Sequence, residues 1–375
     1  MAGIYIHVPF CKQACHYCNF HFSTLPHTIG AVVEAIGKEI VLQRDYLGGV
    51  PIQTIYVGGG TPSLLPPHAV GKLFELVRQH FSIMPDAEIT LEANPDDVSK
   101  TKLTSWRSMG INRLSIGVQS FQNVVLKFLN RAHDARAAIK SIQLAQEVGF
   151  DNVSVDLMYA IPGLSHALWT QDVHTAAGLG PVHVAAYCLT IEPRTVFGHR
   201  QATGQWQQVE DEFAADQYTT LIDTLAAYAY DQYEVSNFCK TGRQSQHNLG
   251  YWSQQPYLGI GPGAHSYNGH TRQHNLAHNV GYVKSLREDI LPTTIEVLQR
   301  KDHINEYIMT RLRTLEGCDL RHLKRRYQHD VQAIHGAYLD RIISRGWAQC
   351  KDEQLQLCSS GLLLADKVAM DLFVD

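Results

Sequence analysis

Residues 4–18 read IYIHVPFCKQACHYC. The β-branched and aromatic run Ile4–Val8 is typical of a strand, and Cys11, Cys15 and Cys18 follow it within eight positions. The chain has eight cysteines, and the other five are scattered. In a reducing compartment, a tight cysteine group is more often a metal site than a disulfide network. The segment therefore predicts a metal centre at the end of a strand.

Three thiolates can ligate three irons of a cubane cluster and leave the fourth iron with an open position. Ordinary electron-transfer clusters use four cysteines and close that position. An open iron can be chelated by the amino and carboxylate groups of a ligand. A structural zinc site is the alternative, with His7, His16 or His21 as its fourth ligand.

Strand-like and helix-like stretches alternate from residue 3 to about residue 190. Such alternation predicts right-handed βαβ units around a parallel sheet. Six units suit a partial α/β barrel, although the periodicity alone also permits a doubly wound open sheet. The expected strands are Ile4–Val8, Thr54–Val57, Glu88–Glu92, Arg113–Gln119, Val153–Tyr159 and His183–Thr190.

The alternation stops beyond residue 190. We expect a helix over Val209–Tyr230, a strand over Tyr233–Phe238 and a loop over Thr241–Leu249. Residues 1–240 are interpreted as the barrel, residues 241–292 as a connecting segment and residues 293–375 as a small, mostly helical, winged-helix-like domain. Its basic run Lys324–Arg326 is interpreted as a solvated helix face.

The composition limits the class of protein. The 375 residues are 45% hydrophobic and 18% charged, which is enough to bury a core. The net charge of −4 gives no reason to expect nucleic acid as the main partner. No stretch approaches a membrane span and no signal peptide is visible, so we expect a cytoplasmic protein.

Polar and glycine residues stand at the expected strand ends, where ligand sites of parallel sheets gather. Gly58–Pro62 follows the second strand, where glycines let the backbone approach a ligand. A carboxylate suits ribose hydroxyls or a sulfonium, and an arginine suits a carboxylate. Individually, each side chain also fits strand-end capping or a surface ion pair. The four side chains are Glu92, Gln119, Arg131 and Asp156.

Cys-x₃-Cys-x₂-Cys followed by Gly58–Pro62 resembles the signature of the radical-SAM superfamily. Nearly the whole chain resembles its HemN/HemW branch, through Tyr5–Cys11, Glu92–Pro95, Gly117–Phe121 and Val155–Leu157. The resemblance implies a partial (βα)₆ barrel with a small helical C-terminal domain. It also implies a [4Fe–4S] cluster on the three cysteines and a pocket for S-adenosylmethionine (SAM). The implied pocket residues are Tyr5, Tyr17, Gly59, Gly60, Thr61, Glu92, Gln119, Arg131 and Asp156.

Two features separate the branches of this family. The oxygen-independent coproporphyrinogen oxidases carry a fourth cysteine where this chain has Phe20, and a long extension where this chain has ten residues before Cys11. Both differences favour resemblance to the heme chaperones. The oxidase, which decarboxylates two propionates of coproporphyrinogen III, remains the alternative. No residue is assigned a catalytic role, and whether the chain is an enzyme stays open.

The run His247-Asn-Leu-Gly-Tyr251-Trp252 is similar to the His-Asn-x-x-Tyr-Trp motif of the chaperones. An imidazole can bind heme iron while aromatic rings pack on the macrocycle, so His247, Tyr251 and Trp252 are candidate heme contacts. In the alternative interpretation, His247 satisfies backbone groups and the aromatic rings are core.

The resemblance implies a set of partners. Heme is the expected cargo, and it is delivered to acceptor hemoproteins, including membrane-bound ones. An electron donor is expected to reduce the cluster. We expect peripheral attachment to the membrane during delivery.

Overall fold

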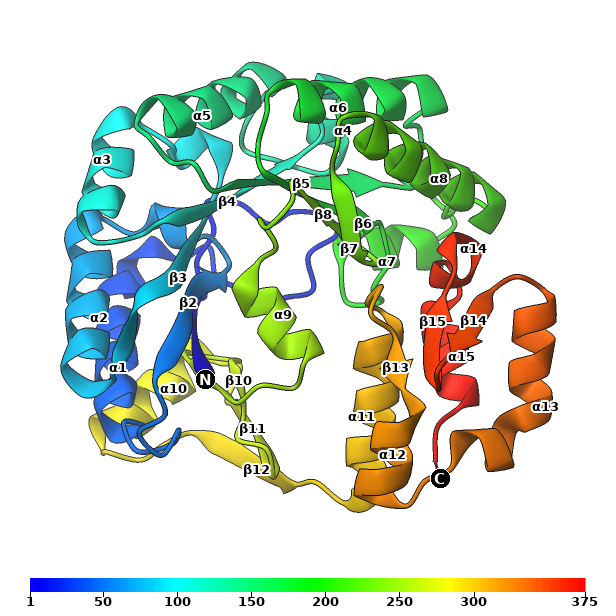
Figure 1. Cartoon of the computed structure of the whole chain (residues 1–375). Coiled ribbons are helices and arrows are strands. Elements are labelled where there is room, and N and C mark those ends of the chain that lie inside the picture. The colour runs from blue at the N-terminus through cyan, green and yellow to red at the C-terminus, as the bar shows by residue number, and fades with distance from the viewer. Residues whose placement is uncertain (375) are drawn as a thin grey trace.

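The computed structural model describes residues 1–374 (Figure 1). Six consecutive strands pair in parallel and in chain order, with a helical crossover between neighbours. This confirms the predicted partial (βα)₆ barrel and replaces the open-sheet alternative. The six strands are β1 (Ala2–Val8), β2 (Ile52–Gly59), β3 (Ile83–Ala93), β4 (Arg113–Gln119), β5 (Val153–Tyr159) and β6 (His183–Cys188).

The crossover helices lie on the outside of the curved sheet (Figure 1). Their starts carry ordinary capping residues: Ser99, Asp134 and Ser165 each accept a backbone N–H in the first turn of their helix. The helices are α1 (Ile29–Leu42), α2 (Pro67–His80), α3 (Lys100–Ser108), α4 (Asn123–Phe128), α5 (Ala135–Glu147) and α6 (His166–Gly178).

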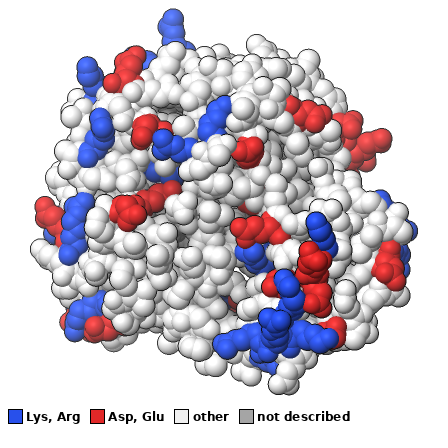
Figure 2. All heavy atoms as spheres, in the orientation of Figure 1, with Lys and Arg blue, Asp and Glu red and all other residues white. Residues whose placement is uncertain are grey.

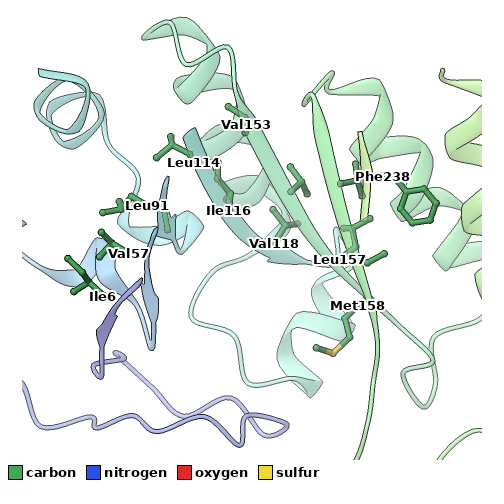
Figure 3. Packing of buried hydrophobic residues seen from close by; sticks show 14 of the residues in the cluster. Ile6, Val57, Leu91, Leu114, Ile116, Val118, Val153, Leu157, Met158 and Phe238 are labelled. Atoms are coloured by element: carbon green, nitrogen blue, oxygen red, sulfur yellow. The ribbon is translucent and has the colours of Figure 1, made fainter. Parts of the chain in front are cut away.

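The core lies between these helices and the sheet. Ile4, Ile6 and Val8 of β1 are fully buried, and Figure 3 shows Ile6, Val57, Leu91 and Ile116 among the packed side chains. Since side chains alternate across a strand, the residues between them face the other way. The barrel interior is therefore polar at this level, and it contains Tyr5 and His7.

The sheet extends beyond the barrel at both edges, giving twelve strands in the order β12-β11-β10-β9-β1-β2-β3-β4-β5-β6-β8-β7. Strand β9 pairs in parallel with β1. Residues 241–292, which we expected to be a connecting segment, thus contribute strands to the main sheet, and β12 does so at the start of the expected C-terminal domain. The added strands are β7 (Asp231–Glu234), β8 (Asn237–Cys239), β9 (Tyr257–Ile260), β10 (His265–Tyr267), β11 (Thr271–Asn275) and β12 (Thr293–Val297).

Two local predictions in this region were wrong. The single strand expected over Tyr233–Phe238 is the tight β7–β8 hairpin, where the Glu234 carboxylate accepts the N–H of Ser236 at 3.0 Å. The loop expected over Thr241–Leu249 contains the start of a helix, α9 (Gln246–Trp252), capped by Ser245. Ser245, directly before the helix, is a favourable N-cap residue and indicates a helix start, whereas the glycine and glutamine content of the segment favours a loop.

The C-terminal region forms a separate helical group beside the barrel (Figure 1). Figure 2 shows a blue cluster at its base, where the exposed residues Arg321, Lys324, Arg325 and Arg326 of α12 lie. Within residues 1–374 no helix combines the length and hydrophobicity of a membrane span. The remaining helices are α7 (Val196–Ala202), α8 (Asp211–Ala227), α10 (Asn279–Arg287), α11 (Arg300–Leu312), α12 (Leu320–Tyr327), α13 (Val331–Ser344), α14 (Ser359–Leu362) and α15 (Ala365–Asp371), and the small sheet contains β13 (Cys318–Asp319), β14 (Ala348–Lys351) and β15 (Gln354–Leu357).

Candidate functional site

The three clustered cysteines lie in the loop between β1 and α1 and line one cavity at the carboxyl end of the barrel. The Thr61 hydroxyl lies 3.5 Å from the Cys11 sulfur, and Arg131 Nη1 lies 3.4 Å from the Cys15 sulfur. Burial raises the pKa of Cys11 to about 11, and the two neighbouring thiols add to that rise. Soft thiolates beside a cationic guanidinium fit an iron–sulfur cluster, whose irons compensate the charge that burial disfavours.

The zinc alternative gains no support from the structure. The candidate fourth ligands form hydrogen bonds elsewhere. Both ring nitrogens of His7 are engaged, by the Tyr5 hydroxyl and the His21 carbonyl, and Nδ1 of His16 bonds to the Phe128 carbonyl. His21 bonds to Asn279 at 2.7 Å. In the described part of the chain, no three Cys, His, Asp or Glu side chains surround a position for a single metal ion. A cluster does not require its cysteines to converge on one ion, because its ligands bind different irons.

The cavity has a volume of about 430 Å³. Eight of the nine residues expected to hold SAM line it, together with the cysteines, and they come from β2 to β5, the cysteine loop and the segment after α4. Asn94, Ser115 and Met158 also line it and were not singled out from the sequence, although each lies on or next to an expected strand. The eight expected residues are Tyr17, Gly59, Gly60, Thr61, Glu92, Gln119, Arg131 and Asp156.

Tyr5 is the exception. It faces the barrel interior below the cavity, where its hydroxyl bonds to His7 Nδ1 at 3.0 Å and its ring stacks with Tyr56 at a centroid distance of 6.1 Å. Burial, and secondly the Glu92 carboxyl, raise the pKa of Tyr5 well above its usual value. Tyr5 therefore supports the pocket from underneath and does not line it.

The glycine turn after β2 brings the backbone against the cysteine loop. Gly59 has a φ of +117°, which favours glycine, and a Cβ there would lie 2.8 Å from the His7 ring. A Cβ on Gly60 would lie 2.7 Å from the Phe10 carbonyl oxygen and 3.0 Å from the Cys11 sulfur. Side chains at Gly60 would thus disturb the cysteine loop as well as the cavity.

Two carboxyl groups lie at the bottom of the cavity. Glu92 accepts the Tyr56 hydroxyl at 2.8 Å and the Gly59 N–H at 3.2 Å, and Asp156 accepts the Ser115 hydroxyl at 3.1 Å. Burial raises the pKa of Glu92 to about 7 and that of Asp156 to about 6, and each value is mainly a cost of desolvation. These carboxylates are suited to accept hydrogen bonds from ligand hydroxyl groups.

Arg131 supplies the positive charge of the cavity. Its Nη2 donates to Asn94 Oδ1 at 2.7 Å and to the Gly117 carbonyl at 2.6 Å, which fixes the guanidinium beside Tyr17 and Cys15. Its buried Nε has no hydrogen-bond partner among the described residues. A fixed guanidinium suits a carboxylate ligand.

The helix α9 presents its motif differently from what we expected. His247 is only 3% exposed, with Nδ1 bonded to the Thr54 hydroxyl at 2.7 Å and Nε2 bonded to the Tyr251 hydroxyl at 2.8 Å. Both ring nitrogens are engaged, so His247 offers none to a heme iron in this arrangement. Tyr251 and Trp252 line a second cavity of about 210 Å³, next to Tyr257, Tyr267 and Arg272.

A three-cysteine loop and a glycine turn at the carboxyl ends of a partial (βα)₆ barrel define a radical-SAM type of protein. The Radical SAM superfamily matches residues 5–173, and the HemN C-terminal domain matches residues 298–364. The heme chaperone HemW of Bacillus subtilis is 32% identical over 98% of both chains, and that of Mycobacterium tuberculosis is 35% identical over 99% of this chain and 94% of its own. This chain belongs to the HemW family of radical-SAM proteins.

A solved structure supports the fold. The coproporphyrinogen III oxidase HemN from Escherichia coli, described as a radical SAM enzyme, superposes with a TM-score of 0.86 over 100% of this chain and 90% of its own. The two chains are 22% identical, so the likeness concerns the fold. Membership of the superfamily implies a [4Fe–4S] cluster and SAM.

Proposed function

We propose that this protein is a radical-SAM heme chaperone, which binds a [4Fe–4S] cluster, SAM and heme and delivers heme to acceptor hemoproteins. The observation that carries the proposal is the convergence of Cys11, Cys15 and Cys18 with a charged pocket on a chain of the HemW family. The names of the relatives support the heme part of the proposal.

In this proposal each pocket residue has a chemical task. The three thiolates hold the cluster, which supplies an electron to SAM when both are bound. Arg131 binds the SAM carboxylate, and Glu92 and Asp156 accept its ribose hydroxyls. The missing side chain of Gly60 lets the cysteine loop at Phe10 and Cys11 pack against the glycine turn.

Heme is the proposed cargo. Support comes from the aromatic cavity beside α9, where Tyr251 and Trp252 provide ring surface for a macrocycle. Arg272 also lines this cavity, and its guanidinium, which pairs with Glu306 at 2.5 Å, is a cation suited to a propionate. Axial ligation by His247 requires the ring to give up at least one of its two hydrogen bonds, each worth about 0.5–1.5 kcal/mol. Acceptor hemoproteins, including membrane-bound ones, and an electron donor complete the proposed partners of a cytoplasmic protein.

The rival function is that of an oxygen-independent coproporphyrinogen III oxidase. Phe20 occupies the position of the oxidase's additional cysteine, is 69% exposed and lines the cavity, where it brings no thiol. The structural likeness to HemN shows a shared fold and leaves the two activities to be separated by chemistry.

The test is one anaerobic preparation with reconstituted cluster, SAM and a strong reductant, assayed in parallel for heme binding and for coproporphyrinogen III turnover. We expect a heme Soret band and transfer of heme to an apo-hemoprotein, without decarboxylation. Conversion of coproporphyrinogen to protoporphyrinogen by this preparation would overturn the chaperone and establish the oxidase.

A further inference from the structure

We infer that α9 supports the SAM pocket without lining it, and that His247 is a positioning residue, which holds Tyr56 and through it the carboxylate of Glu92. The inference rests on the SAM-binding part of the proposed function. It gives the His-Asn-x-x-Tyr-Trp helix a task that does not involve the iron of heme.

The seating of α9 inside the barrel is the first step. Figure 1 shows α9 within the ring of strands, and its first backbone groups, the N–H of Gln246 and of His247, both donate to the Glu88 carboxylate at 3.1 Å. Glu88 belongs to β3 and is buried, and Arg113 Nε lies 4.0 Å from it. Because residues four apart on a strand point to the same face, Glu88 seats the helix on the side of the sheet where Glu92 points.

The ring of His247 is fixed from two sides. Its hydrogen bonds to Thr54 and Tyr251 join opposite edges of the imidazole, and they prevent the ring from turning. Burial lowers the pKa of His247 to about 3, so the ring is neutral at pH 7 and holds one donor and one acceptor. The close fit depends on Gly3, where a Cβ would lie 2.8 Å from the Thr54 hydroxyl and 3.2 Å from His247 Cε1.

The contact then passes to Tyr56. The His247 and Tyr56 rings stack at 5.1 Å between centroids and 27° between planes, and Tyr56 also stacks with Tyr5. The hydroxyl of Tyr56 donates to Glu92 Oε1, while the Gly59 N–H fixes Oε2. The orientation of the Glu92 carboxylate therefore depends on a ring whose place is set by His247.

The experiment compares SAM binding in reconstituted wild-type protein and in His247→Ala, Tyr56→Phe and the double variant, using the change that SAM causes in the EPR signal of the reduced cluster. We expect each single variant to weaken SAM binding about tenfold, the equivalent of one lost hydrogen-bond or stacking contact. The double variant should lose little more than either single variant, because both act through Glu92.

Three further variants sharpen the result. His247→Gln keeps a hydrogen-bond donor and an acceptor, so it should restore part of the SAM affinity. Tyr251→Phe removes only the hydroxyl that bonds to His247 Nε2, and it serves as the test if His247→Ala does not fold. His265→Ala removes an exposed histidine of β10 and should leave SAM binding unchanged.

Wild-type SAM affinity in His247→Ala, or fully additive losses in the double variant, would overturn the inference. The SAM-binding part of the proposed function would be contradicted by a different result, namely wild-type protein that carries the cluster and shows no EPR response to SAM. A Soret band that disappears in His247→Ala while SAM binding is retained would return His247 to the iron of heme.

Discussion

Glu92 and Asp156 are carboxyl groups in a place that disfavours their charge. Both are buried, the Asp156 carboxyl further raises the pKa of Glu92, and hydrogen bonds from Tyr56, Gly59 and Ser115 offset only part of the desolvation. A bound ligand with hydroxyl groups stabilises the ionised forms by donating to them. Ionising these two buried carboxyl groups therefore costs folding free energy when no ligand is bound, and this cost depends on pH.

The first prediction concerns that pH dependence. The pKa of Glu92 is raised in the folded protein from 4.5 to about 7, so the folded state binds more protons than the unfolded state between these values. Stability is therefore lost as the pH rises through this range. Without SAM, the melting temperature of Glu92→Gln relative to wild type should increase between pH 5 and pH 8.

Thermal unfolding of reconstituted protein at both pH values measures this difference. The control is Glu34→Gln on the exposed side of α1, which should give the same difference at pH 5 and pH 8. A relative melting temperature of Glu92→Gln that falls with pH would contradict the raised pKa.

At the scale of an element, the cysteine loop is held from both sides. Its ends are joined by Cys11 N–H to the Ser23 carbonyl at 3.0 Å and by Ser23 N–H to the Pro9 carbonyl at 2.9 Å. Its middle contacts the segment after α4, where the Asn130 side chain donates to the Ala14 carbonyl at 2.7 Å. These hydrogen bonds fix the loop so that its three cysteine side chains line the cavity.

The second prediction follows from this placement. Each of the replacements Cys11→Ala, Cys15→Ala and Cys18→Ala should abolish the visible charge-transfer absorption of a thiolate-bound cluster. Each cysteine is the protein ligand of one iron, so its loss leaves that iron without a protein ligand. Iron and sulfide content after anaerobic reconstitution measures the loss. Cys358→Ala, in the C-terminal region, should keep the full content. A triplet variant with wild-type iron and sulfide would show that the ligand assignment is wrong.

At the scale of the whole molecule, one hydrophobic cluster extends from the barrel into the C-terminal region. Backbone hydrogen bonds also join the two parts, from Val235 N–H to the Arg313 carbonyl at 3.0 Å and from Leu315 N–H to the Tyr233 carbonyl at 3.2 Å. The barrel that carries the pocket and the C-terminal helices beside it therefore share their packing.

The third prediction tests the core. Leu91 on β3 is fully buried next to the pocket strand ends, so Leu91→Ala should lower the free energy of unfolding by about 2–5 kcal/mol. Leu363→Ala, at a site that is 44% exposed, should change it by no more than about 0.5 kcal/mol. Urea unfolding followed by circular dichroism gives both values. Equal effects of the two variants would argue against the described core.

The sequence alone determined the six barrel strands, the cysteine triplet and the glycine turn. These features were predictable because strand periodicity, cysteine spacing and glycine content are local signals. Eight of the nine expected pocket residues meet in one cavity for a related reason: carboxyl ends of parallel strands share one edge.

Tertiary structure decided the remainder. Tyr5 lies below the pocket because β1 turns alternate residues inward and outward, and the facing ring of Tyr56 comes from the next strand. His247 is held by a hydrogen bond to Thr54, which is 193 positions away in the chain, and the pairing of β9 with β1 joins segments that lie still farther apart in the chain. A motif read along the chain shows which chemistry its residues can perform. Contacts between distant segments determine which of its atoms remain free to perform it.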